Sequence, residues 1–340
     1  MAHLIMEHRH VRFPNEYFVR GLHLSRRDLT VQACLFNRTG ENQTKNYIFN
    51  DVPSYPQPEF HVSHLKHDTH LTAFMKIQED GGFRNPNITE DRPPLVWWSL
   101  NLRPEDITSA EARFLQNKYP DLITPQAQAE ARFLEHFATS PAFLKTSRLG
   151  SYRFTVSVED VLNAYSQQFC SGAAPVLRAF ETILYKKEVM YVVLVHSPDH
   201  QQYEDYPLLG DDPGTVCYYR DGQFIWTAQA MCSTHRYELV KIPEENQFRA
   251  DKLNRGIYYI WDNVAIALHM EKDQVLKFDP DKLSVTPCEQ DEIVYRDNFD
   301  SLKEAEGHIK RSPWRLLKRP GPGPGDVIKP RSWSLALMSQ

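Results

Sequence analysis

The sequence predicts an α+β fold in which mostly antiparallel sheets carry helices packed on them. Three observations favour this class. Strand-like segments outnumber helical ones after residue 150, an Asp-Gly hairpin signature joins two of them, and 41% hydrophobic with 24% charged residues is typical of a globular chain. With 340 residues, the chain is long enough to bury a large core without disulfides.

The first half of the chain is predicted to combine strands with helices. A strand-like segment at 59–65 precedes apolar residues at helical spacing over 71–78. The glycine pair at 81–82 closes this helix, because glycine accepts the left-handed conformation beyond a helix end. Two further helices are predicted at 106–119 and 124–136.

The second half is predicted to be rich in strands. We expect a strand at 152–158, one or two helices at 159–169 and 176–184, a buried strand at 189–195 and a hairpin at 216–227. Four short strands follow, at 237–242, 257–261, 275–278 and 292–295, and then a helix at 302–310. The hairpin is the clearest local signal. Asp221-Gly222 lies between two aromatic β-like segments, and a type I′ turn needs positive φ at both central residues.

These elements divide the chain into three parts. Residues 1–58 form either an N-terminal extension or part of the core, and residues 59–312 form the main α+β domain. Within it, 104–147 can be a helical insertion. Residues 313–340 are rich in alternating proline and glycine followed by basic residues, so we expect a flexible tail.

Composition and charge argue against several classes of protein. The net charge of −5 does not favour binding to duplex nucleic acid. The N-terminus lacks the apolar stretch of a secretory signal, and the longest apolar segment, 191–195, is far shorter than the ~20 residues of a membrane span. Five scattered cysteines without Cys-x-x-Cys spacing fit free thiols in a reducing compartment. We therefore expect no membrane association and a cytoplasmic or nuclear location.

Four histidines recur at intervals of three residues, at His61, His64, His67 and His70. Imidazole is a common zinc ligand, so a metal site is one interpretation of the series. The spacing argues against it, because neighbours in the series would face opposite sides of a strand and would drift around a helix. We therefore expect no metal site in this chain, and we expect at least three of the four histidines to face solvent in a loop and at a strand edge.

A second interpretation concerns Lys66-His67-Asp68-Thr69, at a strand end directly before the helix that ends in Gly82-Phe83. The amides of a helix N-terminus suit a pyrophosphate, His67 can hydrogen-bond a ribose hydroxyl, and Thr69 can cap the helix. This layout resembles the first nicotinamide-binding motif of the poly(ADP-ribose) polymerases and diphtheria-toxin-like ADP-ribosyltransferases. The family usually has His-Gly-Thr, whereas this chain has Asp68 in place of the glycine.

The next motif of that family is a short strand whose aromatic side chain stacks on nicotinamide, often within Gly-Ile-Tyr-Phe. Two segments are similar to it. Trp97, within Leu-Val-Trp-Trp-Ser, follows His67 at the family's usual distance, while Tyr258, within Arg-Gly-Ile-Tyr-Tyr, matches better in letters but comes much later. The two are alternative candidates. An aromatic residue on a strand is otherwise a core residue.

The last motif is a glutamate on a late strand. Gln290-Asp291-Glu292, followed by Ile-Val-Tyr, is similar to the Gln-x-Glu version of that element. The resemblance implies that Glu292 orients the ribose and stabilises an oxocarbenium-like transition state. The alternative is a solvated turn that enters a strand.

Together the resemblance implies an ADP-ribosyltransferase-like protein with NAD as substrate, transferring ADP-ribose to protein. Glu292 and His67 would be catalytic, and Thr69, Gln290 and either Trp97 or Tyr258 would bind NAD. Two alternatives remain open. One is a catalytically inactive module that binds ADP-ribose or a protein. The other is an unrelated α+β interaction protein whose exposed aromatic residues form the contact surface.

Overall fold

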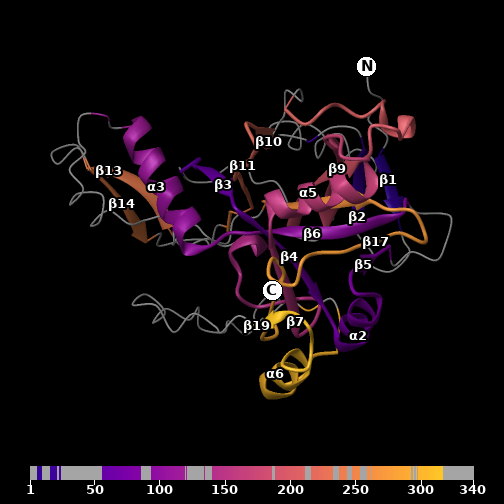
Figure 1. Ribbon diagram of the computed structural model, residues 1–340. Helices are drawn as coiled ribbons and strands as arrows, with labels where there is room; N and C mark the ends of the chain where they lie inside the picture. The colour runs from indigo at the N-terminus through magenta and orange to yellow at the C-terminus, as the bar shows by residue number, and fades with distance from the viewer. Residues whose placement is uncertain are drawn as a thin grey trace.

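The computed structural model describes the following residues: 6–9, 16–20, 23, 56–85, 93–118, 120, 134, 140–185, 188–210, 216–232, 237–242, 247–252, 259–260, 262–291, 294, 296 and 298–316. Within them a ten-stranded sheet forms the centre of the molecule (Figure 1). Its strands, in spatial order, are β1 (Met6–Arg9), β2 (Glu16–Arg20), β8 (Val176–Tyr185), β9 (Glu188–His196), β16 (Asp262–His269), β6 (Leu95–Asn101), β4 (His64–Thr69), β7 (Tyr152–Ser157), β18 (Ser284–Pro287) and β19 (Arg315–Leu316).

Antiparallel pairing dominates this sheet. Two of its neighbouring pairs, β9 with β16 and β18 with β19, run parallel, and the others run antiparallel. Four small sheets accompany it: β10 (Cys217–Arg220) with β11 (Gln223–Thr227) and β3 (Glu59–Val62), β12 (Ala230–Cys232) with β15 (Tyr259–Ile260), β13 (Tyr237–Ile242) with β14 (Gln247–Lys252), and β17 (Val275–Leu276) with β5 (Phe83–Arg84). The predicted α+β class is therefore confirmed.

Four α-helices are described: α2 (Leu71–Asp80), α3 (Pro104–Lys118), α5 (Val158–Phe169) and α6 (Leu302–Ile309). Two short 3-10 helices, η5 (Pro141–Phe143) and η6 (Gln201–Tyr203), lie in connections. In Figure 1, α2 and α6 lie at the lower end of the molecule, whereas α3 and the β13–β14 hairpin lie at the left.

One face of the large sheet, here called the helix face, packs against α2, α5 and α6. Phe74 of α2 stacks on Tyr152 with ring centroids 4.4 Å apart, and Tyr165 of α5 and Ile309 of α6 belong to the same buried cluster. A smaller buried cluster lies on the opposite face and includes Phe180 of β8. Burial of these apolar side chains supplies the main stabilisation of the fold.

Local signals explain where the helices begin and end. The Ser157 hydroxyl accepts a hydrogen bond from the Asp160 amide and so caps α5. Ser301 and Glu304 form a capping box at the start of α6. Gly81 ends α2 in the left-handed conformation, at φ 65°, as the sequence predicted.

The Asp221-Gly222 turn joins β10 to β11 as predicted, with φ of 51° and 76°. Residues 176–184, by contrast, form strand β8 and not the predicted helix. This segment mixes apolar residues compatible with either period, and pairing with β9 on one side and β2 on the other decides the outcome.

The structure also shows how both ends of the described chain join the large sheet. Strands β1 and β2 join it through β8, so these residues of 1–58 are part of the sheet. At the other end, β19 pairs with β18 and Trp314 is buried, so the domain continues past 312 to Leu316. The predicted helix at 124–136 lies almost wholly outside the described residues, as does the tail from 317.

Candidate functional site

Strand β4 carries the residues of the predicted His-x-Thr motif. It lies between β6 and β7, with His67 opposite Phe154 and Asp68 opposite Arg153 of β7. Side chains alternate along a strand, so His67 points to the helix face, while Lys66 and Asp68 point to the opposite face. The charged residues of the motif are thereby separated from its histidine.

His67 is partly buried among aromatic side chains. Its ring centroid lies 5.2 Å from that of Phe83 and 5.5 Å from that of Trp98. Nδ1 lies 2.7 Å from the Trp97 carbonyl oxygen. A carbonyl only accepts, so Nδ1 carries the proton and Nε2 is the acceptor in the neutral ring. Burial lowers the pKa of His67, and the positive charge of Arg296 acts in the same direction, which favours the neutral form at pH 7.

Asp68, the departure from the family pattern, is held by Arg153. Nε and one terminal nitrogen of the guanidinium each donate to a carboxylate oxygen at 2.7 Å, and both side chains are about nine-tenths buried. Burial alone would raise the pKa of Asp68, but the Arg153 charge and hydrogen bonds lower it. The remaining guanidinium donors contact the carbonyl oxygens of Leu144 and Thr146, each at 2.9 Å. Asp68 thus orients an arginine that fixes a loop.

Lys66 reinforces the same loop. Its Nζ donates to the carbonyl oxygens of Pro141 at 2.6 Å and Leu144 at 3.3 Å. Burial and the neighbouring Arg153 lower the pKa of Lys66 to about 7. Lys66 and Arg153 thus both donate to backbone carbonyl oxygens on the face opposite His67.

Helix α2 begins immediately after the motif. Its N-cap is His70, which makes no side-chain cap hydrogen bond, and the first turn contains no acidic residue. The prediction that Thr69 caps this helix is therefore wrong. Thr69 is still a strand residue, it is buried, and its carbonyl oxygen lies against Gly150, where an added Cβ would approach it to 2.2 Å.

Strand β6, with the first aromatic candidate, is hydrogen-bonded directly to β4. Trp97 itself points away from His67 and packs against the cluster on the opposite face, which includes Phe180. Trp98 shares the face of His67 but is 1% exposed. The structure therefore does not bring the rings of His67 and Trp97 together, because adjacent residues of a strand face opposite sides.

Gln290 is exposed and forms an isolated parallel bridge with Ser147. The Ser147 side chain hydrogen-bonds Asp68, so this segment runs beside the end of β4. Asp291, the next residue, forms a 2.7 Å ion pair with Arg148. Glu292 and Tyr258 lie outside the described residues.

The four histidines of the 61–70 series do not form one cluster. His61 lies on β3, His64 and His67 lie on β4, and His70 is the N-cap of α2. Within the described ranges, His200, His269 and Glu271 come together instead. Sequence analysis did not single them out, because they are distant in the chain and carry no motif spacing.

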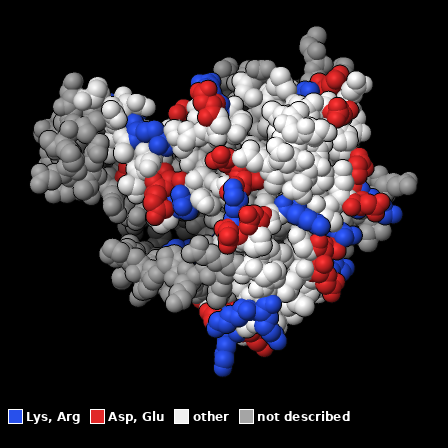
Figure 2. Space-filling model, viewed as in Figure 1, with Lys and Arg blue, Asp and Glu red and all other residues white. Residues whose placement is uncertain are grey.

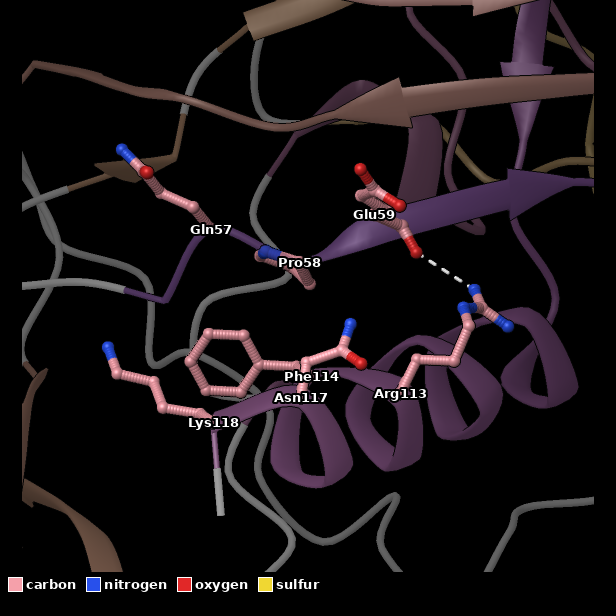
Figure 3. Close-up of a pocket in the computed structure, with 7 residues that line it drawn as sticks. All are labelled: Gln57, Pro58, Glu59, Arg113, Phe114, Asn117 and Lys118. Carbon is pink, nitrogen blue, oxygen red and sulfur yellow. Dashed lines mark hydrogen bonds between the residues drawn. The ribbon is translucent and has the colours of Figure 1, made fainter. Parts of the chain in front are cut away.

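A separate groove of about 320 Å³ lies between the start of β3 and the last turns of α3 (Figure 3). Glu59, Arg113 and Lys118 are among its lining residues, and Arg113 donates to the Glu59 carbonyl oxygen at 2.8 Å. None of the predicted site residues lines it. Lys and Arg alternate with Asp and Glu over the face in Figure 2, where the described residues show mixed charge.

The predicted aromatic contact surface is not found among the described residues. Their exposed large hydrophobic side chains are those of Met75, Leu149 and Leu208, none of which is aromatic. Nor does any helix in the described part of the chain have the length and apolar character that a bilayer span requires.

Comparison with protein-family models, with curated proteins and with solved structures gave no match.

Proposed function

We propose that this chain is an ADP-ribosyltransferase-like protein that binds NAD or ADP-ribose where β4 passes into α2. The observation that carries this proposal is the start of α2, which follows His67–Thr69 directly and has neither a capping side chain nor an acid in its first turn. Free amides and the positive end of the helix dipole attract anions, and a pyrophosphate is such an anion.

Charge around this junction supports the proposal. The positive charge of Arg296 contributes to the lowered pKa of both His67 and His70, after the larger effect of burial, so the guanidinium lies near both rings. Asp68 does not oppose an anion here, because its carboxylate points to the other face and is paired with Arg153. The departure from His-Gly-Thr therefore adds no unpaired negative charge beside the helix.

The tautomer of His67 is also compatible with binding a ribose hydroxyl. With Nδ1 donating to the Trp97 carbonyl, Nε2 can accept a hydrogen bond from a ribose hydroxyl. Trp97 points to the opposite face and Trp98 is fully buried, so Tyr258 would supply the stacking aromatic ring. ADP-ribose transfer would additionally use Glu292, whereas binding alone would not.

Calorimetry with ADP-ribose and with NAD tests this function. Arg296→Glu reverses the charge beside the helix start, and we expect at least a tenfold loss of affinity, about 1.4 kcal/mol. Arg220→Glu, on β10, is the matched control and should leave the affinity unchanged. No binding to the wild-type chain at millimolar ligand would exclude the proposal.

Transfer is assayed separately, with labelled NAD and the Glu292→Gln variant. Label incorporation that is lost in Glu292→Gln supports a transferase. Binding without incorporation in the wild type supports the alternative, an inactive module that recognises ADP-ribose.

A further inference from the structure

Two parallel neighbouring strands, β9 and β16, end at the same edge of the large sheet. β9 ends at His196 and β16 ends at His269. After β9 the chain turns through His200 into η6, and after β16 it continues to Glu271. Three imidazoles and a carboxylate therefore gather where the strands end.

The ligand atoms of three of these residues are close together. One nitrogen from each of His200 and His269 and one oxygen of Glu271 all lie within 4.8 Å of one another. Nε2 of His269 is 3.5 Å from Oε1 of Glu271. A tetrahedral zinc site with bonds of about 2.1 Å places its ligand atoms about 3.4 Å apart, so this pair already has the required separation.

Among the described residues, the ring nitrogens of His269 make no hydrogen bond. The side chain is 1% exposed, and neither Nδ1 nor Nε2 has a hydrogen-bond partner. Buried polar groups are rarely left without partners, because their desolvation is then uncompensated. His196 differs, since its Nε2 accepts from Arg178 at 2.9 Å and its Nδ1 lies 2.7 Å from the Ser197 carbonyl oxygen.

The position of His269 is fixed by its surroundings. Its carbonyl oxygen accepts a 2.6 Å hydrogen bond from the Tyr165 hydroxyl of α5, and its backbone is in register with Leu95 of β6. The ring packs edge-on against His200, with centroids 4.2 Å apart, and against Tyr203 at 5.3 Å. Such packing holds a metal ligand in place before the metal binds.

We propose that His200, His269 and Glu271 bind a zinc ion, with a fourth position open to water. Two imidazoles and one carboxylate are a ligand set that zinc accepts in sites with an open position. The Glu271 side chain is 58% exposed, so the site faces solvent on that side and can admit the ion. This proposal departs from the sequence-based expectation that the chain has no metal site, which was argued from the spacing of the 61–70 histidines.

The site does not depend on the proposed dinucleotide function. His269 lies on the face opposite His67, and β6 separates β16 from β4. Loss of zinc binding and loss of ADP-ribose binding are therefore independent outcomes.

Zinc titration of the untagged full-length chain, stripped with a chelator and followed with a competing chromophoric chelator, tests the proposal. His200→Gln and Glu271→Gln remove one ligand each at positions that are not fully buried, so both variants should fold. His61→Gln, on β3, is the control for loss of any histidine. Circular dichroism verifies the fold of each variant.

We expect the wild type and His61→Gln to bind one zinc equivalent that His200→Gln and Glu271→Gln bind at least about 10–100-fold more weakly. Weaker binding at His3, His8 and His10 of the N-terminal segment would persist in all four chains. Equal affinity and stoichiometry in all four proteins would overturn the proposal, as would the absence of binding to the wild type at micromolar zinc.

Discussion

The buried pair of Asp68 and Arg153 gives the sharpest prediction for stability. We consider Asp68→Asn, which keeps the shape of the side chain and removes its charge. Both partners are about nine-tenths buried, and two 2.7 Å hydrogen bonds join them. Removing one member of a buried pair leaves the other charge uncompensated and costs about 3–5 kcal/mol. The loop held by Arg153 at Leu144 and Thr146 should loosen as well.

The pH dependence of this effect has a definite sign. The folded-state pKa of Asp68 is lowered, so its contribution is fully present above the unfolded-state value of about 3.9 and is lost as the pH falls through the folded-state pKa. The difference in unfolding free energy between wild type and Asp68→Asn should therefore persist down to pH 5, with a change near pH 7, where Lys66, whose charge interacts with that of Asp68, titrates. It should shrink below about pH 4.

Chemical denaturation at several pH values measures both effects. Asp80→Asn is the matched control, because Asp80 pairs with Arg84 at 2.6 Å, but the side chains are 23% and 48% exposed. An exposed pair of this kind contributes at most about 1 kcal/mol. If Asp68→Asn costs no more than Asp80→Asn at pH 7, or if the difference persists unchanged in acid, the described pairing is refuted.

Three further substitutions probe the surroundings of the site by chemical denaturation. Phe74→Ala should cost about 3–5 kcal/mol, because Phe74 is fully buried and stacks on Tyr152; a cost below 1 kcal/mol would contradict that packing. Gly150→Ala should cost more than about 1 kcal/mol, since the new Cβ would meet the Thr69 carbonyl oxygen at 2.2 Å. An unchanged denaturation midpoint would show that the end of β4 can shift to make room for the methyl group. Ser301→Ala should cost about 0.5–2 kcal/mol through loss of the α6 cap, with recovery in Ser301→Asp.

The elements that could be predicted were those with a local cause. The Asp221-Gly222 turn and the end of α2 at Gly81 both follow from backbone conformations that few residues adopt. Strand β8 could not be predicted in this way. Its residues suit either a helix or a strand, and its state depends on β9 and β2, which are brought alongside only by the complete sheet.

In the candidate site, too, the local features were predictable from the sequence and the pairings between strands were not. The junction of β4 with α2 was predictable from a strand-like segment, a helical spacing and a glycine end. That Asp68 pairs with Arg153 was not, because the pairing depends on the register of β4 against β7. The register against β6 likewise decides that Trp98, and not Trp97, shares the face of His67.

Sheet direction links the two proposed sites. β4 and β16 each run antiparallel to β6, and β9 runs parallel to β16, so the carboxyl ends of all three strands meet at one edge. Strand ends place side chains where the backbone ladder stops and ligands can approach, so this edge is a natural place for binding sites. His67 lies near this edge on the helix face, and His269 lies at the same edge on the opposite face. The single strand β6 between them is why one edge can hold two chemically different sites that need not share a ligand.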